Sequence, residues 1–397
     1  MKKTLLLQTA LVAAAGLMLA DAASAQDKAV PIGVTVGGYM TRSFSVQDRG
    51  ARQVDQPAAT FAAPDAEIWF NIRSVLDNGT VVGGRIELEG STEADQIDES
   101  YLFVERRDIG RIEVGSTDLV PNKMLYGTPN AIPGDSTTVA GSVGDYFGGS
   151  YQMWFGAIPN DKEHINIYTS SNRYFGSKAG KGLQLGFSYL PNACEDRGTS
   201  AGTTGSCQTF SAAANSSTVN NMQNVYAAAA NYIESFGPVD AALYASWYTG
   251  KPASSTFASA GGTDNVGGYQ SGVNFAYNIG DGSQVQLGGL YTQESLDANT
   301  ANKHGWAGGL KYLTNGAKPG SVGLGVEGRK VRVTNLTNIN GDGNGSEETL
   351  YMLGVTYQVA TGILTFAGVG NEKVNYDTAS ISDNKQTFGT VGIRLDF

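Results

Sequence analysis

The chain has 397 residues, of which 53 are glycine, and charged residues make up only 16% of it. This composition excludes an ordinary helical soluble domain, which carries about 7% glycine and about 25% charged residues. The 27 basic and 37 acidic residues give a net charge of −10, so we expect no nucleic-acid partner, because an acidic surface repels phosphate.

The first 25 residues are a predicted secretory signal peptide. Lys2 and Lys3 precede an apolar stretch from Leu5 to Ala20, and Ala23-Ser24-Ala25 has the small residues that a signal peptidase accepts. We therefore expect segment 1–25 to be removed after export, with a retained membrane anchor as the alternative. After Ala25 no window approaches 18 consecutive apolar residues, so a mature chain within a membrane must form a closed barrel.

Apolar residues alternate with small or polar ones along most of residues 26–397, which is the period of strands with two different faces. Between Tyr269 and Ile279, for example, Val273 and Phe275 share one face, and Gln270 and Asn274 share the other. The pattern predicts sixteen strands, at about 33–46, 65–75, 80–89, 98–106, 110–116, 164–175, 182–190, 223–235, 238–249, 268–279, 283–293, 305–313, 320–333, 348–359, 362–373 and 386–397.

The connectors between these strands alternate between short and long. Asp77-Asn78-Gly79 and Gly280-Asp281-Gly282 are tight turns, whereas the connector at about 117–163 is by far the longest. Tight periplasmic turns and long external loops are typical of a transmembrane β-barrel. We therefore predict an all-β chain with one domain at 26–397, a sixteen-stranded antiparallel transmembrane barrel whose tyrosine and tryptophan residues gather near strand ends.

The sequence also resembles a known family at several places. Thr390–Phe397 resembles the outer-membrane assembly signal, with Gly392, Leu395 and the terminal Phe397 at its characteristic positions. Glu99–Ser116 resembles the strand, turn and strand that precede the constriction loop of general diffusion porins. Gly37-Gly38-Tyr39 with Arg42, and Asn78-Gly79-Thr80 leading to Glu87-Leu88-Glu89, resemble the first strands of the same porins.

The resemblance is to the sixteen-stranded trimeric porins of alphaproteobacteria and their relatives. It implies a homotrimer in the outer membrane, surrounded by lipid and lipopolysaccharide and inserted by the barrel-assembly machinery through Phe397. It also implies that the 117–163 loop folds into the barrel and narrows it. No cofactor is expected, because diffusion through such a channel involves no chemical step.

The resemblance suggests charged residues on two sides of this constriction. The acidic side would be formed by loop residues Asp118, Asp135, Asp145 and Asp161. The basic side would be formed by Arg42, Arg73, Arg85 and Arg111, each within a strand where lipid contact at mid-depth would cost about 2–4 kcal/mol. The alternatives are arginines at the rim near headgroups and aspartates in external, solvated loops. The excess of acids predicts a slight preference for cations.

Other candidate sites are less specific. Cys194 and Cys207 lie in one Ser/Thr/Gly/Asn-rich stretch, and an oxidising compartment favours a disulfide between them. Asn340, Asp342 and Asn344 resemble the start of a Ca²⁺-binding loop, but Tyr351 stands where such a loop has its twelfth-position Glu, so a polar hairpin loop is the alternative.

The sequence favours a channel over an enzyme. Barrel hydrolases need a histidine activated by an acid or paired with a serine, and the only histidines, His164 and His304, lie in no such motif. We therefore predict an outer-membrane porin for passive diffusion of small hydrophilic solutes and ions. The alternative is a non-conducting barrel that displays its loops as an adhesin or receptor.

Overall fold

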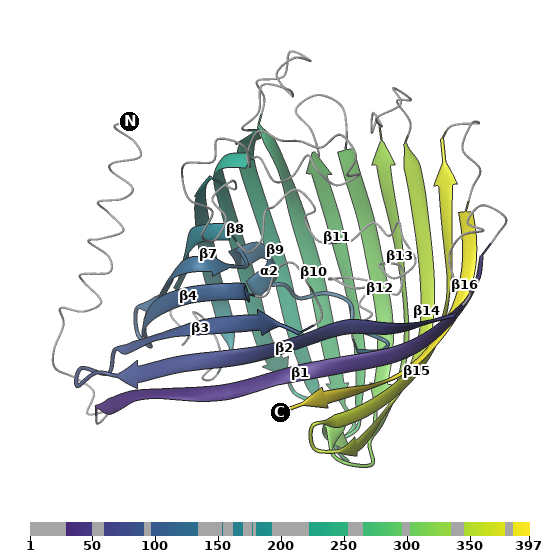
Figure 1. Ribbon diagram of the computed structural model, residues 1–397, viewed down its shortest axis with the longest axis horizontal. Coiled ribbons are helices and arrows are strands. Elements are labelled where there is room, and N and C mark those ends of the chain that lie inside the picture. Colours follow the sequence, from purple (N-terminus) through teal and green to yellow (C-terminus); the bar gives the residue numbers. More distant parts are fainter. Residues whose placement is uncertain are drawn as a thin grey trace.

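The computed structural model describes residues 29–49, 59–90, 97–133, 153, 162–169, 177, 180–192, 222–252, 265–295, 302–334, 345–377 and 384–397. In these ranges the sheet is a single closed barrel in which each strand pairs with its neighbours in sequence and β1 pairs with β16 (Figure 1). No helix among the described residues is long and apolar enough to cross a membrane.

The strands, in chain order, are β1 (Val30–Arg49), β2 (Ala59–Val75), β3 (Val81–Glu89), β4 (Ile97–Arg106), β5 (Gly110–Thr117), β6 (Lys162–Thr169), β7 (Gly182–Asn192), β8 (Met222–Phe236), β9 (Val239–Pro252), β10 (Val266–Asn278), β11 (Gln284–Ser295), β12 (Asn302–Leu313), β13 (Val322–Thr334), β14 (Ser346–Ala360), β15 (Ile363–Tyr376) and β16 (Asn384–Asp396). All sixteen predicted strands are confirmed. The largest difference is that β2 begins six residues earlier than expected, and β6 is described only as far as Thr169.

The barrel closes where its first and last strands meet. β1 and β16 pair in antiparallel register from Tyr39–Asp396 to Arg49–Gln386. Inside this seam the Ser45 hydroxyl donates to Thr390 Oγ1 at 2.9 Å. At its end the Gly38 N–H donates to the Phe397 carbonyl at 2.9 Å, and the Phe397 N–H donates back at 3.0 Å. The C-terminal residue is therefore part of the sheet.

The two faces of the strands differ as the alternation predicts. On β10 the outward Tyr269 is 45% exposed, whereas its inward neighbour Gln270 is 1% exposed. Trp69 is an aromatic residue on the otherwise mostly polar inner face. Its ring meets that of Tyr39 edge-on, with 5.8 Å between the ring centroids. Not every tyrosine near a strand end faces outward, since Tyr248 of β9 is buried inside the barrel and donates to Glu294 at 2.6 Å. Tyr269, Trp306 and Tyr312 do face outward.

The core of the molecule lies inside the barrel rather than between layers. After β5 the chain turns inward through the short helix α2 (Val120–Lys123), which the strands enclose in Figure 1. Val120 and Met124 pack with Tyr244 and Leu290 of the wall, and Ile132 packs with Phe366 and its neighbours farther round. Segment 118–133 therefore crosses the inside of the barrel.

Candidate functional site

Segment 118–133 is fixed to the inner wall through its backbone. Asn231 of β8 donates its amide to the Met124 carbonyl at 3.0 Å, and Asn274 of β10 does the same for Gly127 at 2.9 Å. Similar bonds join Tyr244 to the Pro121 carbonyl, Asn166 to that of Asp118 and Lys311 to that of Asn130. A loop inside a barrel needs such partners, because a buried carbonyl without a hydrogen bond costs about 1–3 kcal/mol of folding stability.

The wall beneath this segment is a track of inward glycines, and a Cβ on any of them would touch the segment. Gly272 and Gly288 lie against the carbonyls of Tyr126 and Gly127, and Gly325 would bring a Cβ to 2.7 Å from the Ala131 Cα. Gly325, Gly354 and Gly368 are in register on three adjacent strands. The missing side chains let the segment lie flat on the wall.

The wall of β2 to β5 carries interleaved charges. Arg85 donates to Glu87 at 2.6 Å and stacks 4.5 Å from the Trp69 ring centroid. Arg111 donates to Glu113 at 2.8 Å. The other acids on this wall include Glu67, Glu99 and Glu105. Both arginines have an acid two residues along the same strand, where alternation puts the two side chains on one face.

Lys123 brings the helix α2 into this cluster. Its ammonium lies 3.2 Å from Glu113 and 3.9 Å from Glu99, and 4.3 Å from the centroid of the Tyr101 ring. Burial alone would lower the pKa of Lys123, but Glu113 and Glu99 outweigh it and hold the pKa above its usual value. Lys123 is therefore a permanent cation at the edge of the open passage.

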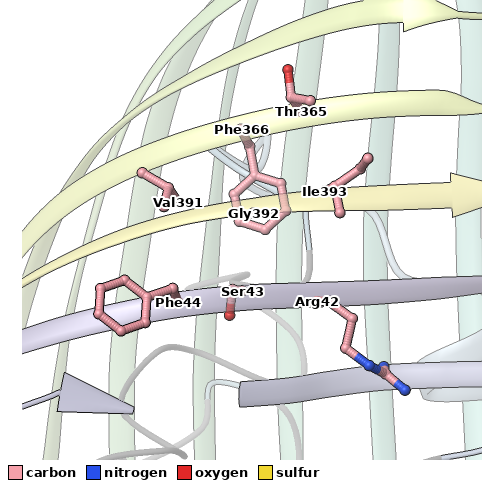
Figure 2. Close-up of a pocket in the computed structure, with 8 residues that line it drawn as sticks. All are labelled: Arg42, Ser43, Phe44, Thr365, Phe366, Val391, Gly392 and Ile393. Carbon is pink, nitrogen blue, oxygen red and sulfur yellow. The ribbon is translucent and has the colours of Figure 1, made fainter. Parts of the chain in front are cut away.

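The predicted basic residues do not all face the lumen. Arg73, Arg85 and Arg111 share the inner face with Trp69 and Glu113, with Arg73 exposed near the turn between β2 and β3. Arg42 lies on the outer face (Figure 2), beside a hollow of about 480 Å³ that it lines with Phe44 and Ile393, so its predicted place on the pore wall is wrong. Its position alternates with the inward Thr41 and Ser43 and matches the outward Met40 and Phe44.

In the described ranges the charges are not separated into an acidic loop and a basic wall, as the sequence had led us to expect. The described loop segment contributes the cation Lys123 as well as the acid Asp118, and beside Arg85 and Arg111 the wall carries the acids Glu87, Glu99, Glu105 and Glu113. The reason is local neutralisation, since Arg-x-Glu on β3 and β5 supplies each arginine with its own carboxylate. Asp135, Asp145 and Asp161 lie outside the described residues, as do Cys194, Cys207, Asn340, Asp342 and Asn344.

Asp118 is the predicted loop acid that can be placed. Its N–H donates to Glu99 Oε1 at 3.2 Å, and the Asn122 amide donates to its carboxylate at 3.4 Å. Burial, together with the nearby Glu99 charge, raises the pKa of Asp118 to about 7. This carboxyl therefore changes charge near neutral pH, whereas an ordinary aspartate loses its proton at a pH of about 4.

The cation preference of the channel should consequently rise with pH. Below the raised pKa Asp118 is neutral, and above it a negative charge is added beside the passage, so cations are favoured more between about pH 5 and pH 9. The reversal potential under a KCl gradient, measured across this range, should show the step, and Asp118→Asn should remove it. Asp108→Asn, at an exposed turn, is the matched control, and a step that persists in Asp118→Asn would contradict the assignment.

Other candidate chemistry on the described residues is limited. Glu67, Glu89 and Asp98 bring carboxylate oxygens within 4.8 Å of one another, but Glu67 already accepts from Tyr39 at 2.6 Å and from Trp69 at 2.9 Å. His164 is buried on β6, whereas His304 is exposed on β12. The two histidines belong to strands that do not pair with each other.

A closed barrel with an apolar outside, a charged inside and an internal segment defines a channel protein of the outer membrane. The family model for Gram-negative porins matches residues 9–377, and the chain belongs to this family. It is therefore a diffusion channel of the outer membrane and not an enzyme.

Solved structures support the fold. The chain is similar to the trimer form of in-vitro folded OmpT of Vibrio cholerae, at 12% identity and a TM-score of 0.56, covering 92% of this chain and 99% of that one. It is also similar to an anion-selective porin from Comamonas acidovorans, at 13% identity and a TM-score of 0.54, with 92% of this chain and 100% of that one covered. A Salmonella typhi OmpF complex with daunomycin is similar at 12% identity and a TM-score of 0.57, with 92% of this chain and 97% of that one covered. No curated protein sequence matches the chain.

Proposed function

We propose that small hydrophilic solutes and ions diffuse between segment 118–133 and the charged wall of β2 to β5, and that the loop at about 117–163 sets the size limit. The observation that carries this proposal is the path of the segment across the lumen, anchored by wall side chains and seated on glycines. A mild cation preference follows from the excess of acids over Arg85, Arg111 and Lys123 around the passage.

Shortening the loop tests the proposal directly. Replacing residues 119–158 by a short Gly-Ser link should raise single-channel conductance in planar bilayers and admit larger neutral solutes, because the barrel cross-section then limits flow. Circular dichroism and heat-modifiable migration should show that the barrel still folds. A barrel that conducts neither before nor after the change would contradict the proposal and favour a display role, and clear anion selectivity would contradict the cation preference.

Assembly of the chain belongs to the same proposal. A homotrimer is supported by the family and by the trimer form recorded for the Vibrio cholerae neighbour, and three-step closure of single insertions would test it. Recognition of Phe397 by the barrel-assembly machinery is supported by its place at the end of the seam. Cleavage after Ala25 is supported by the small residues there, and the alphaproteobacterial type rests on the resemblance spread over residues 26–397.

A further inference from the structure

A pocket of about 260 Å³ lies between the helix α2 and the inner wall, near the place where β4 turns into β5. Lys123 and Met124 of segment 118–133 line one side of it, and Glu105, Arg111 and Glu113 of the wall line the other. Its volume is several times the share of one water molecule in the liquid, about 30 Å³. The pocket can therefore hold a small solute.

Two positive and two negative side chains line this pocket. The charges of Arg111 and Lys123 are balanced by those of Glu105 and Glu113. A simple cation or anion that enters meets a like charge as well as an opposite one, whereas a solute that carries both charges can satisfy both kinds of partner. The charge balance therefore favours a zwitterion over a simple ion.

The two acids differ in how available they are to a solute. Glu113 is 4% exposed and already accepts hydrogen bonds from four side chains. Glu105 accepts one long bond, 3.4 Å from Arg111 Nη1, and its other carboxylate oxygen has no partner in the described part of the chain. Glu105 is therefore the acid that can accept a hydrogen bond from the ammonium of a solute.

Arg111 offers a donor for a carboxylate beside this acid. Its Nε and Nη1 donate to Glu113 and Glu105, while Nη2 has no hydrogen-bond partner among the residues that the structure describes. The guanidinium carbon lies 3.8 Å from the centroid of the Phe103 ring, which supports the plane of the group. The side chains of Arg111 and Glu105 are 27% and 28% exposed, so a solute in the lumen can reach both.

The short distance between these two groups selects among zwitterions. Because Glu105 and Arg111 are in contact, the ammonium and the carboxylate that they receive must also lie close together. In an α-amino acid one carbon separates the two charged groups, whereas several carbons separate them in 4-aminobutanoate. Met124 adds an apolar surface for a small side chain.

We propose that this pocket is a subsite for small α-amino acids with uncharged side chains, which bind with the carboxylate at Arg111 and Lys123 and the ammonium at Glu105. The inference rests on the proposed function, since it names a class of solute that uses the passage. The charged groups that receive the solute are partly exposed to water, so each contact is weak. A bound amino acid can therefore leave again, as passage through a channel requires.

Saturation-transfer NMR of the detergent-solubilised protein, with alanine as the probe, tests the site without requiring conduction. Alanine should bind, whereas propionate and ethylamine, which each carry one of its two charges, should bind about five-fold more weakly or worse. We also expect 4-aminobutanoate to bind more weakly than alanine. These comparisons use the unchanged protein, so they do not depend on the folding of a variant.

Glu105→Gln removes the negative charge that receives the ammonium and keeps the size of the side chain. This variant should bind alanine about five-fold more weakly. It should bind propionate at least as well as the wild type does, because a carboxylate that repels propionate is gone. Asp108→Asn removes the same charge from an exposed position in the neighbouring turn and should bind alanine as the wild type does.

Equal binding of alanine, propionate and ethylamine would overturn the proposal, and so would equal binding of alanine and 4-aminobutanoate. Equal affinity of Glu105→Gln and Asp108→Asn for alanine would also overturn it. A protein that conducts ions in planar bilayers but does not bind alanine contradicts this inference and leaves the proposed function intact. A protein that binds alanine as described but does not conduct supports the subsite and contradicts the proposed function.

Discussion

Leucine in place of Gly288 is expected to narrow the channel. A Cβ at Gly288 would overlap the Gly127 carbonyl and lie 3.0 Å from the Pro129 ring, both in the segment that crosses the lumen, and it would also lie 2.9 Å from the Val273 carbonyl of β10. Gly288 is held in register with strands on both sides, so we expect the segment to yield more than the wall, toward the inside of the barrel. Single-channel conductance should therefore fall about two-fold or more.

A glycine on the opposite face of the neighbouring strand provides the control for this change. Gly308 is on the outer side of β12, where a Cβ would meet nothing nearer than 3.8 Å. Gly308→Leu adds the same side chain outside the barrel and should leave conductance unchanged. Equal conductance in Gly288→Leu and Gly308→Leu would show that the segment does not limit the flow of ions.

Replacing Lys123 by glutamine should give the largest change in ion selectivity. Lys123 balances Glu113 and Glu99, and those acids in turn keep its pKa above the usual value, so the cation is present at neutral pH. Its removal leaves two carboxylates beside the passage without this counter-charge. The ratio of potassium to chloride permeability should rise several-fold, and most clearly near 0.1 M salt, where the screening length is about 10 Å.

Arg42→Gln is the matched control for Lys123→Gln. It removes one positive charge from the same protein, but from the outer face, where Arg42 donates to the Thr41 carbonyl at 2.7 Å. The reversal potential of this variant should equal that of the wild type. If both variants shift the potential equally, the effect follows net charge, and Lys123 has no special place in the passage.

The strand pattern of this fold could be predicted closely because lipid imposes it. An outward side chain on every second residue must be apolar, so strands such as β10 can be located by alternation alone. The same rule would have placed Arg42 outside, because it alternates in step with Met40, Phe44 and Val46. The charge of Arg42 suggested a place in the lumen, but its position in the alternation of β1 correctly indicates the outer face.

The arrangement within the lumen was harder to predict. The Arg-x-Glu spacing at Arg85 and Arg111 was present in the sequence and signals charges neutralised along one strand. Contacts such as Asn274 with Gly127 join residues 147 positions apart, and no local pattern indicates them. Inward glycines indicated only a small-residue face, since the segment that needs the space comes from elsewhere in the chain.

The seam between β1 and β16 also has a consequence for the order of folding events. Ser45 and Thr390 are 345 positions apart, yet their hydroxyls meet inside the closed barrel. The sheet therefore has two open edges until residues 384–397 pair with β1, and ring closure is necessarily a late event. Contacts of such high sequence separation form slowly. During that delay the unpaired edges can pair with other chains, so a helper that shields them matters most in the interval before closure.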